Sequence, residues 1–371
     1  MVSTSSPDVF LIGGGPAGLA CAIAAAQAGL SVELADAAKP SIEKACGEGL
    51  MPDSVQELQN LGVDLSDADK FPFRGIRFIK QQQSTEANFP HGMGYGVRRL
   101  QLHALLTARA QQAGVRFRWG CAVRSMENGT VTTAHHQVTP RWIIGADGHQ
   151  SVVRKWAGLD AGSLRSTRIG LRQHYGIAPW SPFVEIYWGD AAQAYVTPIS
   201  THEVCVVFIA TKKFASVDHA LNNFPELKER LRGAPRTTVS RGAITLQRKL
   251  RRVTAGNIAL VGDASGSVDA ITGEGLALGF RHAIALVDAL QQNDLTRYEV
   301  AHQRIGQLPH FMSQMLLLLD RHRFARTRTF NAFSGNPDLF GRMLNLHISN
   351  RPPQLLGSNG VLAMGLKLLT T

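Results

Sequence analysis

Short apolar runs recur along the chain, separated by segments whose apolar residues follow a helical period. Four runs predict buried strands of the parallel type, at residues 9–12, 31–35, 142–144 and 257–261. Residues 168–210 instead alternate apolar and polar positions, which is typical of an antiparallel sheet. Helices are predicted at 53–61, at 97–113, from Gly275 onward, and through most of a tail from Tyr298 that breaks near Arg351.

A glycine-rich loop lies between the first predicted strand and an alanine-rich helix. Gly13, Gly15 and Gly18 fit the G-x-G-x-x-G pattern, and the strand–loop–helix context makes the match specific. Gly13 permits the tight turn, Gly15 lets the backbone approach a pyrophosphate, and Gly18 lets helix and strand pack closely. Asp36 ends the second predicted strand, near the offset of about 20 residues at which an acid binds a ribose hydroxyl. We therefore predict a dinucleotide-binding unit.

Two later glycine–acid motifs, at Asp147–Gly148 and Gly262–Asp263, complete a set of three. Together the three motifs resemble the FAD-dependent hydroxylase superfamily, which has the fold of p-hydroxybenzoate hydroxylase, over nearly the whole chain to about residue 295. The resemblance implies that the first motif holds the ADP pyrophosphate and that Asp147–Gly148 lies near the nucleotide. It also implies that Asp263 binds the ribityl-pyrophosphate region and that Arg99, at a helix start, is a further FAD contact.

Two loops are similar to those of geranylgeranyl reductases within this superfamily. One is the cysteine–glycine loop from Cys46 to Pro52, and the other is the flavin loop from Gly262 to Leu276. The chain departs from that branch at Ala270, where the family usually has proline. It also departs at the aromatic–proline substrate motif, where residues 194–198 read Ala-Tyr-Val-Thr-Pro.

The expected fold class is α/β: a Rossmann-like FAD-binding domain of the glutathione-reductase type, an interleaved antiparallel β-sheet substrate domain and a helical C-terminal tail. We assign residues 1–73, 96–167 and 253–297 to the FAD-binding domain, which is discontinuous. Residues 74–95 and 168–252 form the substrate domain, and 298–371 form the helical C-terminal region.

The loop Gly273–Glu274–Gly275 opens a predicted helix. Backbone N–H groups at such a helix start would face the pyrimidine edge of a flavin and stabilise the negative charge that reduction places there. Glu274 is a candidate proton donor or a solvated first-turn acid, and Cys46 is a candidate catalytic thiol or a packed one. The predicted cofactor-binding residues are Gly13, Gly15, Pro16, Ala17, Gly18, Asp36, Cys46, Gly47, Arg99, Asp147, Gly148, Gly262, Asp263, Gly273, Gly275 and Leu276.

Composition and charge limit the partners. The 371 residues are 44% hydrophobic, carry a net charge of +11 and include four scattered cysteines in no metal-binding pattern, so we expect a folded cytoplasmic protein without a bound metal. Basic residues gather between Lys228 and Arg252 and again after the apolar run 315–319. A solvated face and a peripheral membrane contact both fit this charge, whereas nucleic acid does not, because no recognised binding motif accompanies it.

Three functions remain open on the sequence alone. The first is an FAD-dependent monooxygenase acting on a lipophilic or aromatic metabolite, with the flavin in a water-excluding pocket. The second is a geranylgeranyl-reductase-like ene-reductase of isoprenoid or polyene double bonds. The third is a non-catalytic flavin-binding partner protein. A second G-x-G-x-x-G unit is absent from the sequence, so NAD(P)H or another reductant would act as a transient electron donor.

Overall fold

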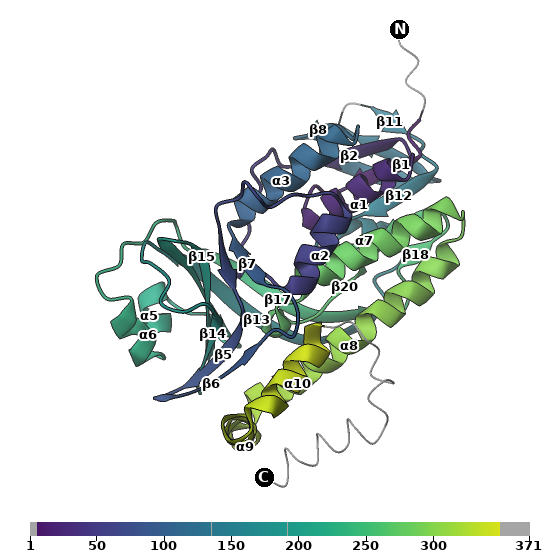
Figure 1. Ribbon diagram of the computed structural model, residues 1–371. Helices are drawn as coiled ribbons and strands as arrows, with labels where there is room; N and C mark the ends of the chain where they lie inside the picture. Colours follow the sequence, from purple (N-terminus) through teal and green to yellow (C-terminus); the bar gives the residue numbers. More distant parts are fainter. Residues whose placement is uncertain (1–5, 135, 191, 349–371) are drawn as a thin grey trace.

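Two β-sheets organise the chain, as a computed structural model shows for residues 6–134, 136–190 and 192–348 (Figure 1). The first sheet has six strands, and all its neighbouring pairs are parallel except β18–β19. The four parallel strands expected from the apolar runs are confirmed at its centre. The strand order is β18 (Thr254–Ala255), β19 (Ile258–Leu260), β12 (Trp142–Gly145), β1 (Val9–Ile12), β2 (Val32–Asp36) and β8 (Arg116–Trp119).

Helices pack on this sheet because its central strands are apolar on both faces, as parallel strands require. Every residue of β1 is buried. Helix α1 (Pro16–Gln27) is alanine-rich and almost entirely buried, and it lies between α3 (Arg99–Gln112) and α7 (Gly275–Gln291). Helix α2 (Pro52–Asn60) packs beside α7, and the short α4 (Val152–Trp156) follows β12.

The second sheet has eight strands and forms the predicted substrate domain. Its pairs are antiparallel except β14–β5. Helices α5 (Val217–Leu221) and α6 (Pro225–Arg230) cover one face through an apolar cluster. The strand order is β20 (Gly266–Ser267), β17 (Arg241–Leu250), β13 (Gly162–Tyr175), β16 (Glu203–Ala210), β15 (Ala192–Ser200), β14 (Val184–Trp188), β5 (Gly75–Lys80) and β6 (Gln83–Asn88).

This sheet takes strands from beyond the expected boundaries of the substrate domain. Strand β13 begins at Gly162, before the boundary placed at 167/168, and β20 joins the sheet from within the segment 253–297. Long pairing with β17 explains the early start of β13, because the ladder runs from Gly162 opposite Leu250 to Arg172 opposite Arg241. Pairing across the whole sheet, which local periodicity does not report, decides where each strand ends.

Three C-terminal helices cover the other face of the eight-stranded sheet. Helix α8 (Leu295–Arg321) begins beside α7 and continues through Pro309, and it is followed by α9 (Arg323–Gly335) and α10 (Pro337–Ile348) (Figure 1). The expected helical tail is therefore present, while the break expected near Arg351 lies outside the described residues. Within the described residues, no helix is long and apolar enough to cross a membrane.

Two small sheets complete the fold. One consists of β3 (Gly49–Leu50), β7 (Gly94–Val97) and β4 (Lys70–Phe73), and the other of β11 (Gln137–Val138), β10 (Thr130–Thr133) and β9 (Val123–Glu127). The first packs between β15 of the eight-stranded sheet and helix α2. At Gly96 a Cβ atom would lie 1.7 Å from the carbonyl oxygen of Pro198, so β7 crosses β15 at a distance that only glycine permits.

Candidate active site

A cavity of about 1100 Å³ lies between the glycine loops of the first sheet, the eight-stranded sheet and the C-terminal helices. This volume is at the upper limit of the roughly 300–1,000 Å³ usual for small-molecule sites, so it has room for a cofactor and a substrate together. The predicted site residues that line it are Gly15, Pro16, Ala17, Cys46, Gly47, Arg99, Gly148, Gly262, Asp263, Gly273, Gly275 and Leu276.

The glycines of the first loop have two different roles. A Cβ atom at Gly13 would lie 2.4 Å from the carbonyl oxygen of Ala146, and one at Gly18 would lie 2.0 Å from the carbonyl oxygen of Gly13. These two glycines allow backbone segments to touch. A Cβ atom at Gly15 would meet nothing within 4 Å, and Gly15 faces the cavity as the N-cap of α1. Gly15 therefore leaves space at the helix start for a bound anion.

The donor set around this space fits a pyrophosphate and its sugar. The guanidinium group of Arg99 lines the cavity, and its buried Nε has no hydrogen-bond partner among the described residues. Asp263 is an exposed residue at the cavity surface. Desolvation by the surrounding protein raises its pKa, while the nearby side chains of His149, Lys44 and Arg99 act in the opposite direction. An acid beside basic side chains can accept from a sugar hydroxyl while the basic groups bind phosphate. The residues present fit FAD.

Asp36 and Asp147 make backbone contacts. The Asp36 carboxylate accepts hydrogen bonds from Gly14 N (2.6 Å) and Ala38 N (2.7 Å), which holds the glycine loop against the end of β2. The Asp147 carboxylate accepts from Val152 N (2.7 Å) at the start of α4. Both acids thus shape the loops around the cavity, and their contact with the cofactor stays a prediction.

The flavin loop is tied to the end of the described chain. The ring of His347 in α10 lines the cavity, and its Nε2 is 2.8 Å from the carbonyl oxygen of Thr272, so Nε2 carries the proton and donates. Its Nδ1 lies 3.5 Å from the Glu274 carboxylate. Burial raises the pKa of Glu274 to about 7, while His347 opposes this rise and Asp53 adds to it. Glu274 therefore titrates near neutral pH and contacts His347, which lines the cavity.

A second set of contacts fixes the flavin loop to the substrate sheet and to α8. Asp269 is completely buried and forms an ion pair with Arg168 of β13. Arg168 also donates to Asp320 of α8 (3.2 Å), and the Asp269 backbone N–H donates to Ser313 Oγ (3.3 Å). Because the charges are buried and paired, separating any one of these elements would leave an unpaired charge.

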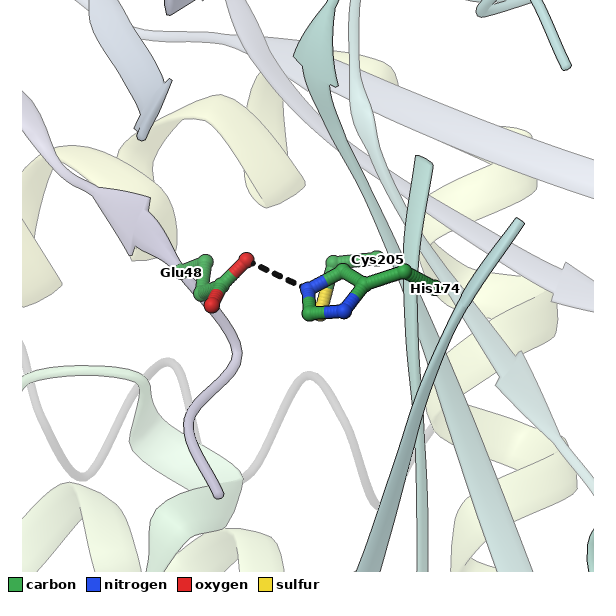
Figure 2. A group of neighbouring side chains, drawn as sticks. All are labelled: Glu48, His174 and Cys205. Atoms are coloured by element: carbon green, nitrogen blue, oxygen red, sulfur yellow. Dashed lines mark hydrogen bonds and ion pairs between the residues drawn. The ribbon is translucent and has the colours of Figure 1, made fainter. Parts of the chain in front are cut away.

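The cysteine–glycine loop is held by a buried ionic network (Figure 2). Glu48, which has a positive φ of 59°, accepts from His174 Nε2 (2.7 Å) and from Arg99 N (3.1 Å). The Nδ1 of His174 lies 2.8 Å from Nη1 of Arg98, and a guanidinium group can only donate. Nε2 of His174 therefore donates to Glu48 while Nδ1 accepts from Arg98. The network holds the loop that presents Cys46 to the cavity.

The same geometry brings Glu48, His174 and Cys205 within reach of one potential metal ion, with ligand atoms within 4.8 Å of one another (Figure 2). Two guanidinium groups oppose a cation there. Arg172 Nη1 lies 3.6 Å from Glu48, and Arg98 occupies the Nδ1 side of His174. Burial raises the pKa of the Cys205 thiol well above its usual range, so the thiolate ligand would be costly to form. We interpret the cluster as a positioning network for the loop.

Apolar side chains form the wall away from the glycine loops. Trp188 and Tyr195, expected on the substrate sheet, line the cavity, while Tyr175 and Tyr187 pack on the opposite face against α5 and α6. This division follows from the alternation of side chains along a strand. Other apolar wall residues are Ile76, Phe78, Ile169, Val184, Ile186, Val207, Ile209, Ile244, Leu246, Met312, Leu316, Leu319, Phe333, Phe340, Met343 and Leu344.

The family model described as FAD binding domain matches residues 6–293. The chain belongs to the FAD binding domain family. It is an FAD-dependent oxidoreductase, and the superfamily resemblance and the fold class expected from the glycine motifs are confirmed. The family match supports the cofactor, and it does not identify the electron donor.

Curated relatives and a solved structure agree with this assignment. The flavoenzyme is 28% identical over 361 residues to a menaquinone reductase of Mycobacterium tuberculosis, covering 87% of this chain and 86% of that one. It is 24% identical over 331 residues to digeranylgeranylglycerophospholipid reductase 1 of Methanothermobacter thermautotrophicus, covering 83% and 82%. A flavoprotein/dehydrogenase from Cytophaga hutchinsonii has the same fold, with a TM-score of 0.83 at 17% identity over 99% of this chain and 100% of that one.

Several residues of the flavoenzyme's site were missed from the sequence. Lys44 and His149 directly adjoin the predicted motifs, so their position beside Cys46 and Gly148 was a usable signal. Glu48 lies within the quoted cysteine–glycine loop. Nothing in the sequence indicated His347, because this residue of α10 contacts Thr272 of the flavin loop across 75 positions of the chain.

We predict that Gly15→Val folds but loses FAD. Gly15 has an extended backbone (φ −71°), and its Cβ would meet no protein atom, so valine fits the apoprotein and blocks only the pyrophosphate. FAD affinity is expected to fall at least tenfold, which is about 1.4 kcal/mol. The measurement is FAD content and a fluorescence titration of the refilled apoprotein. Gly18→Val is the contrasting variant and should fail to fold. A yellow, fully loaded Gly15→Val protein would contradict the assignment.

We predict that Glu274→Gln stabilises the protein more at pH 8 than at pH 5. The Glu274 pKa rises from 4.5 in the unfolded chain to about 7 in the fold, so the wild type loses stability as pH rises through this window. Glutamine has no such loss, and the difference in the free energy of unfolding should grow by about 2 kcal/mol. Urea unfolding of FAD-loaded proteins measures it. The exposed Glu127→Gln serves as the control, and an equal effect at both pH values would refute the buried titration.

Proposed function

We propose that this flavoenzyme is an ene-reductase that reduces carbon–carbon double bonds in a polyprenyl or polyene lipid. The observation that carries the proposal is the continuous apolar wall that extends the cofactor cavity between the eight-stranded sheet and helices α8–α10. A long hydrocarbon chain gains free energy from such a wall in proportion to the apolar area buried. The names of both curated relatives support the proposal, since menaquinone and digeranylgeranyl lipids share polyprenyl chains.

The chain's residues divide the work of binding and chemistry. The N–H groups at the start of α1 and the Arg99 guanidinium bind the pyrophosphate, and Asp263 accepts from the sugar chain. The start of α7 at Gly275 presents its N–H groups toward negative charge. When bound and reduced, FAD supplies the hydride. The sheet and α8–α10 exclude water from the site, which strengthens each electrostatic contact inside it.

Proton supply is the remaining requirement of the reduction. Cys46 lines the cavity and accepts a hydrogen bond from Glu48 N (3.4 Å), so its thiol is placed beside the bound ligands. The Glu274 carboxylate faces His347, which reaches the cavity wall. We propose Cys46 and Glu274 as the groups that hold a proton for the reaction, and NAD(P)H or another reductant as the transient electron donor.

Reduction is preferred to hydroxylation because the two curated relatives described above bear reductase names. Hydroxylation, which would use the same closed cavity and O₂, is the competing reading. The two reactions leave different products from one lipid, since a reduced double bond adds two hydrogen atoms and hydroxylation adds one oxygen atom.

We predict turnover without oxygen. The photoreduced, FAD-loaded protein is mixed anaerobically with menaquinone carrying an unsaturated isoprenoid tail, and the products are analysed by mass spectrometry. The expected product carries two additional hydrogen atoms in its isoprenoid tail, which fragmentation distinguishes from reduction of the quinone ring to the quinol, and the flavin should reoxidise as this product forms. The parallel sample in air serves as the comparison. An oxygenated product that appears only in air would overturn the proposal in favour of hydroxylation.

We predict that Ile186→Trp blocks the lipid without releasing FAD. Ile186 of β14 is buried and lines the apolar wall, so a larger side chain there fills space that the hydrocarbon would use. The expected loss in kcat/KM is at least tenfold, or about 1.4 kcal/mol. The conservative Ile186→Leu variant is the control. Unchanged kcat/KM in Ile186→Trp would show that the lipid does not bind along this wall.

A further inference from the structure

Large apolar side chains are exposed where α8 ends and α9 begins. Phe311 and Leu318 lie two turns apart on α8, so they share one face of the helix. Phe324, at the start of α9 just beyond the end of α8, is 74% exposed, and Leu318 is 54% exposed. Side chains of this kind rarely face water together unless the surface meets an apolar partner.

The same place is strongly basic. Four consecutive residues are exposed here: Arg321, His322, Arg323 and Phe324. The Arg328 guanidinium lies 5.5 Å from the Phe324 ring centre. Burial and the positive charges of Arg326 and Arg323 lower the pKa of Lys80 at the neighbouring end of β5. We call Phe311, Leu318, Arg321, Arg323, Phe324 and Arg328 the α8–α9 corner.

Few carboxylates balance these charges. Asp190 accepts from Arg326 (3.0 Å) and lies 3.8 Å from Arg323. Asp320, at the end of α8, is directed inward to Arg168. The corner therefore keeps a surplus of positive charge beside exposed aromatic and aliphatic groups. That combination complements a surface that is negative at the headgroups and apolar beneath them.

The opposite side of the same helix faces the cavity. Met312, Leu316 and Leu319 line the apolar wall, while Phe311 and Leu318 point outward because neighbouring helical residues differ by about 100° in direction. A surface bound at the corner would thus lie one helix away from the site that we assign to a lipid.

We propose that the α8–α9 corner docks on an anionic phospholipid bilayer, with Phe324, Leu318 and Phe311 inserted at the interface and the arginines on the headgroups. The proposal concerns binding to the bilayer and does not depend on reductase activity. In the sequence, the apolar run 315–319 and the basic residues after it fit a membrane contact without showing which side chains make it. The proposal assigns that contact to the residues of the α8–α9 corner.

The test is cosedimentation of the full-length, FAD-loaded protein with vesicles. One set contains phosphatidylcholine and phosphatidylglycerol in equal amounts, and the other contains phosphatidylcholine alone. Binding is expected with the anionic vesicles and should weaken as salt is raised. Phe324→Ser combined with Leu318→Ser should lower the partition coefficient at least tenfold, and Arg321→Glu with Arg323→Glu should do the same.

Leu164→Ser is the matched control. Leu164 on β13 is 53% exposed, close to the 54% of Leu318, and its cross-strand partner is Arg248, so it also lies beside a basic residue. Equal binding by this control and the wild type supports the proposal. Wild-type protein that ignores anionic vesicles overturns it, and so does binding that both corner variants retain. Sedimentation velocity without lipid adds a further test: a dimer that the corner variants abolish would assign the surface to a second copy instead.

Discussion

Everything in this fold depends on backbone segments that approach one another too closely for any side chain. Gly18 touches the Gly13 carbonyl, Gly13 touches Ala146, and a Cβ at Gly262 would lie 2.6 Å from Ala17. Three strands distant in sequence thereby bring their following loops to one edge of the six-stranded sheet. Close packing at that edge leaves the start of α1 free of protein atoms on its outer side, and a helix start with free N–H groups binds an anion. The cofactor site is thus a consequence of contacts that exclude side chains.

The two faces of the eight-stranded sheet serve different purposes. Side chains alternate along each strand, so one face builds an ordinary apolar core with α5 and α6 while the other forms the wall of the cavity. Helices α8–α10 cover the cavity face without filling it. Their position is held by polar contacts as much as by packing, through Arg168 with Asp320 and through His347 with Thr272. Each of these contacts adds to the apolar packing that holds the three helices over the wall.

Charge placement around the cavity follows one rule. Cationic side chains at the glycine loops remain available to the cofactor, whereas those at the cysteine–glycine loop are consumed by protein acids, as in Arg98 with Glu203 and Arg172 with Glu43. The cationic side chains at the glycine loops can therefore bind a ligand. Those at the cysteine–glycine loop hold that loop in a conformation in which Glu48 has a positive φ. Glu274 belongs to neither set. Its burial raises its pKa to about 7 despite the opposing effect of His347, which keeps it able to exchange a proton near neutral pH.

The sequence by itself determined the cofactor and the framework that holds it, because both depend on local rules. Glycines at fixed offsets report a turn that admits phosphate, and apolar runs report buried strands. Gly15 was predicted from that pattern, Arg99 and Asp263 were predicted from the family resemblance, and all three line the cavity. Tertiary structure alone decided the rest. Which face of a strand meets the cavity, as for Trp188 against Tyr187, is set by the register of the whole sheet. The Glu274–His347 contact joins two segments that are far apart in the chain, so the local sequence does not report it. The start of β13 at Gly162, before residue 168, likewise depends on pairing with a distant strand.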